Sequence, residues 1–145
     1  MVEFDEIAIR NYFINEIQEV FANEYDLIGT EVEVSAWERQ ETTFPCCIVS
    51  LINPIGVERY DDSRGSFRFV NFSLNCDLYS NELGEYSLED SVIKLSQILI
   101  KGIIEKYGTF VVTRNSSVPF RTDVKRRNVT FRCTYDNVNK IIYSN

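Results

Sequence analysis

The clearest pattern in the chain is a strict alternation of apolar and polar residues between positions 70 and 79. Its apolar phase consists of Val70, Phe72, Leu74, Cys76 and Leu78. Because successive side chains of a β-strand point to opposite faces of the sheet, this pattern predicts a long, half-buried strand. We expect the polar phase to face solvent, or another subunit.

A helix is predicted after this strand, with Ser87 as its N-cap and Gly108 as an αL C-cap. Its apolar residues form two adjacent stripes. The first consists of Leu88, Val92, Leu95, Leu99 and Ile103, and the second of Ile93, Ile100, Ile104 and Tyr107. One sheet face cannot cover both stripes. The helix therefore either lies between the sheet and another helix, or contacts a partner chain.

The remaining periodic segments predict one more helix and five more strands. The helix begins after an Asp5 N-cap and ends near Asn23. The strands are expected at residues 27–37, 46–52, 109–113, 125–135 and 140–143, with Asn53 and Pro54 ending the second and residues 114–123 forming a loop. Strands in series joined by short turns favour an α+β fold. We expect a single domain with a mostly antiparallel mixed sheet of about five to six strands and two helices on one face.

Composition and charge narrow the classes of function. A length of 145 residues suits one domain with its own core. A formal net charge of -7 argues against general binding of nucleic acid or anionic membranes. No window has the roughly 18 apolar residues of a membrane span, and the acidic start differs from a signal peptide. We expect a soluble protein made in the cytoplasm, with no membrane contact.

The sequence predicts no catalytic, metal-binding or cofactor-binding residue. There is no histidine, which excludes Ser-His and Cys-His catalysis and zinc sites that need histidine. The paired acids Asp61 and Asp62 are expected in an exposed turn, and Glu89 and Asp90 complement the helix dipole. The four cysteines, Cys46, Cys47, Cys76 and Cys133, adjoin or belong to apolar strand phases, so we expect them to be buried packing residues.

A basic cluster in the second half of the chain is a candidate contact surface. It consists of Arg114, Arg121, Lys125, Arg126 and Arg127. Such a cluster can bind a phosphate backbone or an acidic partner surface. Alternatively, it is a solvated loop and strand start whose charges prevent edge-to-edge aggregation.

The order of elements and several local features resemble the tail terminator (tail completion) proteins of long-tailed bacteriophages. The resemblance covers nearly the whole chain. The matching features are the helix Asp5 to Asn23, the strand ending at Trp37, the Phe44-Pro45 step before an apolar strand, the charged excursion Glu58 to Gly65, the strand Phe67 to Tyr79 that leads into a long helix, and the closing pair Phe110 to Thr113 and Asn128 to Tyr135 with Ser116, Ser117, Pro119 and Asp123 between them.

This resemblance implies a structural virion protein without a cofactor. Its partners would be further copies in a hexameric ring, the tail tube protein, and a neck or head-completion protein. DNA would pass through the channel without specific binding. The implied subunit or tube contacts lie in the arm between two strands, at Glu58, Arg59, Asp61, Asp62, Arg64 and Arg68. The segment Arg114 to Arg127 is a second possible surface, near the partner or the DNA.

Two other classes of function remain open from the sequence. One is another head-tail connector or tail tube component with a similar helix-plus-sheet unit. The other is a non-viral cytosolic protein-binding domain that uses its sheet face for a peptide or ligand.

Overall fold

The computed structural model describes residues 4–37, 43–59, 67–108 and 110–144. Its elements are α1 (Glu6–Asn23), α2 (Tyr25–Ile28), β1 (Glu33–Ser35), β2 (Cys46–Arg59), β3 (Phe67–Ser80), α3 (Leu88–Tyr107), β4 (Val111–Val118), β5 (Lys125–Asp136) and β6 (Ile141–Ser144). The predicted fold class, α+β with a mostly antiparallel mixed sheet, is confirmed. The predicted caps are also present, because Asp5 accepts a hydrogen bond from the Ala8 N–H at 3.0 Å and Ser87 accepts one from the Asp90 N–H at 3.1 Å.

The sheet has the strand order β1-β2-β3-β5-β4, and β6 pairs with β5 beside the end of β4. Only the β1–β2 pair is parallel among the described strands, and the others are antiparallel. The predicted interior position of the apolar strand that starts at Cys46 is confirmed, because β2 lies between β1 and β3.

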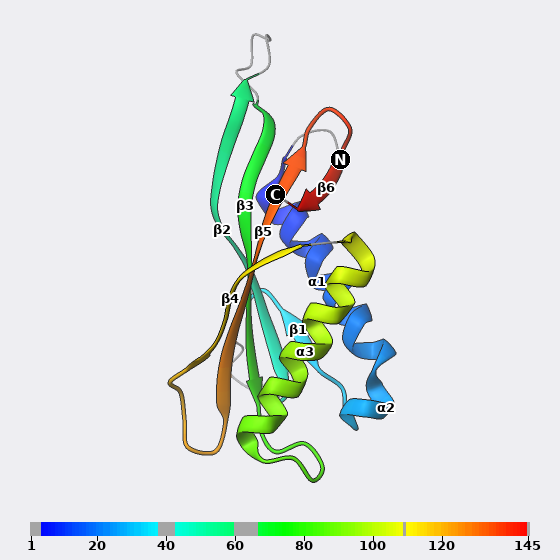
Figure 1. The fold of residues 1–145 in the computed structure, drawn as a ribbon, viewed down its shortest axis with the longest axis vertical. Coiled ribbons are helices and arrows are strands. Elements are labelled where there is room, and N and C mark those ends of the chain that lie inside the picture. The colour runs from blue at the N-terminus through cyan, green and yellow to red at the C-terminus, as the bar shows by residue number, and fades with distance from the viewer. Residues whose placement is uncertain (1–3, 38–42, 60–66, 109, 145) are drawn as a thin grey trace.

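Both long helices cover the same face of the sheet, and no helix of the described residues lies on the other face (Figure 1). Helix α1 contacts β1 and β2, whereas α3 contacts β3 and β5. The helices approach each other closely at Gly102, where any Cβ atom would collide with the side chain of Val20. This glycine lets α3 pack close beside α1 on the sheet.

Most of the apolar surface of α3 is covered within the subunit. The stripe from Val92 to Ile103 is buried in the core, and α1 packs beside it. The ring of Tyr107 stacks on Phe110 with 4.9 Å between ring centroids. Ile104 stays 41% exposed, so a small part of the second stripe faces solvent.

The predicted end of the second strand at Asn53 and Pro54 is wrong, because β2 continues to Arg59. Asn53 has a φ of 51°, and the pairing with β3 shifts register between Ile52 and Ile55. A bulge of this kind takes a proline out of the hydrogen-bonded ladder, so the missing N–H of Pro54 leaves no gap in the pairing. The two strands that flank the charged arm in the sequence, β2 and β3, are therefore both long.

The predicted strand at residues 27–37 is also mostly wrong. Residues 25–28 form the helical turn α2, closed by Gly29 with a φ of 84°, and only Glu33–Ser35 pair with β2. Weak alternation does not separate a strand from a loop. Whether such a segment becomes a strand depends on whether a neighbouring strand offers free backbone hydrogen-bonding groups.

Pairing with β5 likewise extends β4 into the segment that was predicted as a loop. Arg114 lies opposite Thr130, and Val118 lies opposite Arg126. Gly108 has the positive φ that was predicted, at 77°, but its ψ of -139° lies outside the αL region. Its N–H still donates to the Ile104 carbonyl at 2.8 Å and closes the helix.

A polar corner ties the start of β3 to the chain ends. The side-chain oxygen of Asn137 accepts from the Phe4 N–H at 2.6 Å, and its backbone N–H donates to the Arg68 carbonyl at 2.8 Å. Burial raises the pKa of Asp136, but hydrogen bonds from Val138 and Asn139 outweigh it, so the net pKa lies below its ordinary value. Ionised Asp136 therefore stabilises this corner.

Truncating a core side chain of β3 should destabilise the fold strongly. Leu74 is 0% exposed, so Leu74→Ala should lower the free energy of unfolding by about 2–5 kcal/mol. Urea unfolding followed by circular dichroism measures the change. The neighbouring variant Ser73→Ala, on the helix-free face, should change it by less than about 0.5 kcal/mol. Equal losses in the two variants would show that the strand phase is wrong.

Stability should depend on the charge of Asp136. Its folded pKa lies below the unfolded value of about 3.9, so its contribution is complete above that pH and is lost as the pH falls through the folded value. Wild type should lose more stability than Asp136→Asn on acidification below about pH 4. Thermal unfolding between neutral and acidic pH measures the difference, and parallel curves for both proteins would contradict the assignment.

Candidate assembly surfaces

The helix-free face of the sheet carries a hydrogen-bonded network of small polar side chains. The Asn128 amide donates to Asn75 at 2.6 Å and to Asp77 at 3.0 Å, and Thr130 donates to the Asn128 oxygen at 2.7 Å. Asn75 donates to Ser50 at 3.2 Å, which links three strands. Asn128 is only 3% exposed although none of the described helices or strands covers this face. The network therefore stiffens this face and leaves few of its polar groups available to a ligand.

An aromatic cluster lies at one end of the same face. The ring of Tyr79 contacts Phe120 with centroids 4.9 Å apart and Phe44 with centroids 6.4 Å apart. Arg121 stands over Phe44 and Phe120, and Arg126 stands over Tyr79. The cluster fixes the loop between β4 and β5 against the sheet, and Phe120 stays 41% exposed on it.

The predicted arm is described only at its base. Asp61, Asp62 and Arg64, and the side chains of Glu58 and Arg59, lie outside the described part of the chain. Arg68 is described, and its place in an interface stays a prediction. Its guanidinium lies over the Phe69 ring at 4.9 Å, and its charge helps to lower the pKa of Asp136. Arg68 therefore has a structural role at the base of the arm.

The predicted basic cluster is divided between the two faces of the sheet. Arg114 and Arg126 extend from the helix-free face, where Arg126 forms an ion pair with Asp77 at 3.1 Å. Arg127 lies on the helix side and donates to Asn115 at 2.7 Å. Arg121 pairs with Asp123 in the loop at 3.2 Å.

Lys125 begins β5 and is partly buried. A further cation, Arg132, was missed by the sequence reading although it lies in the outward phase of β5. The cations thus share one hairpin without forming a single continuous patch.

The cysteines and one acid pair have local structural roles. All four cysteines are buried thiols, and burial raises the pKa of Cys133 to about 12. A hydrogen bond with Cys76, together with burial, raises the pKa of Cys47 well above its ordinary value. Cys47 and Cys133 therefore stay protonated near neutral pH and are poor nucleophiles. Glu89 accepts a hydrogen bond from Ser117 at 3.1 Å, which connects α3 to β4.

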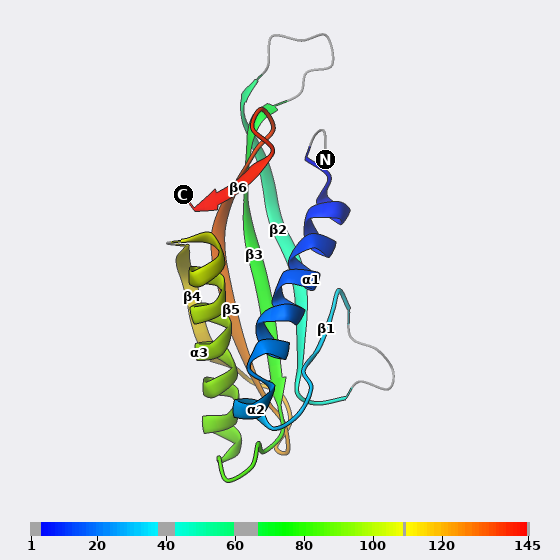
Figure 2. The same ribbon diagram turned by 90° about the vertical axis from the view of Figure 1, so that its right-hand side faces the viewer.

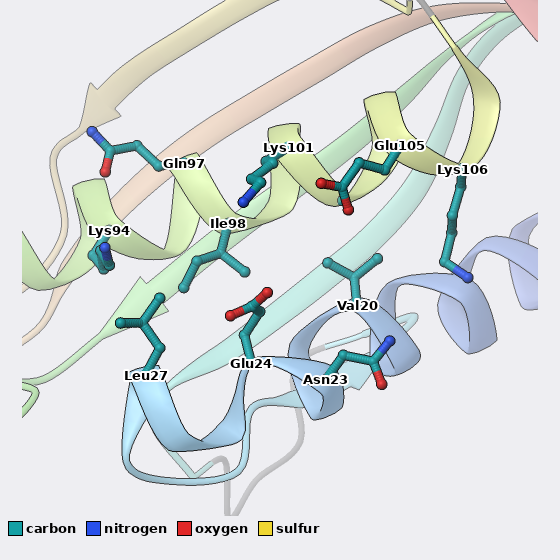
Figure 3. Close-up of a pocket in the computed structure, with 11 residues that line it drawn as sticks. Val20, Asn23, Glu24, Leu27, Lys94, Gln97, Ile98, Lys101, Glu105 and Lys106 are labelled. Atoms are coloured by element: carbon teal, nitrogen blue, oxygen red, sulfur yellow. The ribbon is translucent and has the colours of Figure 1, made fainter.

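A groove of about 420 Å³ separates α1 and α2 from α3 (Figure 3). Val20, Leu27 and Ile98 line its apolar part, and its rim carries Glu24, Lys94, Lys101, Glu105 and Lys106. Lys106 forms ion pairs with Glu16 at 2.9 Å and Glu19 at 3.3 Å and so closes one end. Because charges of both signs meet on the rim, the groove suits a polar surface of another protein better than a single small ion.

In the comparisons with known proteins, no protein-family model and no curated protein matches this chain. Within the described ranges, no three His, Cys, Asp or Glu side chains are grouped as a metal ion requires. The helices of the described residues are too short or too polar to span a membrane. The case for a function therefore depends on the geometry of the subunit.

Breaking the polar network should cost stability although it lies on an uncovered face. Asn128→Ala leaves Asn75 and Asp77 without their shared donor, so the free energy of unfolding should fall by about 1–3 kcal/mol. Urea unfolding measures this loss. Ser116→Ala, the residue opposite Asn128 on β4, is the matched control and should change little. A control variant as unstable as Asn128→Ala would show that the network adds nothing specific.

Proposed function

We propose that this chain is a bacteriophage tail terminator. Copies assemble as a ring on the end of the tail tube, end its polymerisation, and provide the surface to which neck or head-completion proteins bind. The role is structural and needs no cofactor or catalytic residue. By the resemblance set out above, the ring is hexameric and belongs to the virion.

The observation that carries this proposal is the long β2–β3 hairpin. Each strand has 14 residues, and their joined ends extend past the helix layer at one end of the molecule (Figure 2). In the sequence, β2 and β3 are connected by residues 60–66, which include Asp61, Asp62 and Arg64. A projecting hairpin of this kind can contact a neighbouring subunit or the tube, as the arm in the resemblance requires.

The remaining surfaces are consistent with a ring subunit. The helix-free face is a stiff polar sheet, and several large apolar side chains outside the core are exposed, among them Ile7, Leu27 and Ile55 at 61%, 49% and 60%. Exposed apolar residues next to charges are typical of protein interfaces. The net charge of -7 would let DNA pass a channel without the affinity that a basic wall creates.

A second candidate function is a binding domain that takes a peptide or ligand in the groove between the helices. The apolar lining by Val20, Leu27 and Ile98 favours it. Binding of a partner peptide in that groove, together with no effect on tail tubes, would support this class in place of the terminator.

Electron microscopy of polymerised tail tube protein, with and without this chain, tests the proposal. Tubes should stop growing and carry a ring of extra density at one end. Arg64→Glu should leave the monomer folded and reduce capping, whereas Lys94→Glu, on α3, is the control and should cap normally. Bare tube ends of unchanged length would exclude the terminator function, and normal capping by Arg64→Glu would remove this part of the arm from the interface.

A further inference from the structure

Charge is distributed very unevenly along the chain. Residues 5–31, which include α1 and α2, hold seven carboxylates and one arginine, a formal charge of -6. Residues 111–136, which form β4, β5 and their loop, hold six basic side chains and two carboxylates, a formal charge of +4. We refer to the first segment as the acidic flank and to the second as the basic hairpin.

The fold places these two segments on opposite sides of the molecule. β4 is one edge of the sheet and β1 is the other, and α1 contacts β1 and β2. Figure 2 shows β4 on the left, and α1 and β1 on the right. The subunit thus has an acidic edge at β1 and a basic edge at β4. The two segments approach each other where the ring of Phe4, next to the start of α1, lies 6.0 Å from the ring of Tyr135 at the end of β5.

Most of these charges are not neutralised within the subunit. On the hairpin, Arg114, Lys125, Arg127 and Arg132 form no ion pair with another described residue, in contrast to Arg121 and Arg126. On the flank, Glu6, Asp26 and Glu31 are exposed and likewise have no cationic partner in the described part of the chain. Both sides also expose apolar groups, Phe120 on the hairpin and Ile7, Tyr25 and Leu27 on the flank.

We propose that the basic hairpin of one copy binds the acidic flank of the next. This inference rests on the proposed ring, and it names the two surfaces that join neighbouring subunits. The contact is head-to-tail, because the two surfaces are different, and a head-to-tail contact closes into a ring when its rotation allows. Opposite charges steer and orient the copies, and the exposed apolar side chains become buried between them.

A second copy fits the hairpin better than a nucleic acid does. A phosphate backbone needs one continuous track of cations, whereas Arg127 lies on the helix side of the sheet and Arg114 on the other. The net charge of the whole chain, -7, also repels a polyanion. The acidic flank supplies a partner of matching charge on every copy.

A charge-swap experiment tests the contact without any tail tube. The hairpin variant is Arg114→Glu with Arg132→Glu, and the flank variant is Asp26→Lys with Glu31→Lys. Analytical ultracentrifugation at low salt, at up to about 1 mM protein, measures self-association. Glu82→Lys with Glu85→Lys is the control for the flank variant, because it makes the same charge change outside both segments. Lys94→Glu with Lys101→Glu matches the charge change of the hairpin variant, and because these lysines lie on the groove rim beside Leu27 of the acidic flank, added negative charge there should not weaken association. Circular dichroism shows that each variant is folded.

Wild type and both controls should self-associate, and each swap variant alone should do so at least about 100-fold more weakly, because like charges then face each other. An equal mixture of the two swap variants should recover association, since every contact again joins opposite charges. Association should also weaken as salt is raised to about 0.5 M.

Three results would overturn the inference. They are a wild type that stays monomeric at every concentration, swap variants that associate normally, or a mixture that stays monomeric. A wild type that binds duplex DNA through the hairpin without associating would assign the hairpin to nucleic acid. Tube capping is measured separately. If the mixture recovers association but does not cap tubes, the terminator function is excluded and the contact between copies is kept. If both swap variants still cap tubes, the contact through these two surfaces is excluded and the terminator function is kept.

Discussion

The fold depends on burial of one side of β3 beneath the two long helices. β3 pairs along its length with β2 and β5, and its inward residues Leu74, Cys76 and Leu78 are fully buried. A strand buried on one side must have helices close above it, and the contact of Gly102 with Val20 allows both helices to reach the sheet. Sheet length, helix position and the projecting hairpin all follow from this packing.

The polar side of β3 is the necessary counterpart of its buried side. Asn75 and Asp77 alternate with core residues, and Asn128 on β5 satisfies both through its amide group. Because these short side chains bond to one another, the uncovered face needs no second layer to stay rigid. A rigid sheet with one helix layer keeps the end of β2 and the start of β3 at one end of the molecule and the β4–β5 loop at the other (Figure 1).

The strand order converts a gradient of charge along the chain into a difference between two sides of the molecule. The acidic first helix lies beside β1 and β2, and the last long strands form the opposite edge. The chain order alone does not require this, since β5 inserts next to β3 and leaves β4 outside. A subunit with two oppositely charged sides is suited to repeated head-to-tail contact, which the proposed ring would require.

The sequence by itself determined the local elements whose pattern is strong: the alternation of β3, the inward residues of β5 such as Phe131, and the Asp5 and Ser87 caps. Each of these depends on neighbours a few residues away. Tertiary structure decided the rest. The bulge at Asn53, the strand at residues 114–118 and the division of the basic cluster depend on which strand lies alongside, and periodicity does not encode pairing partners. Burial of Asn128 was likewise decided by its hydrogen-bonding partners across the sheet, because its place in the polar phase predicted exposure.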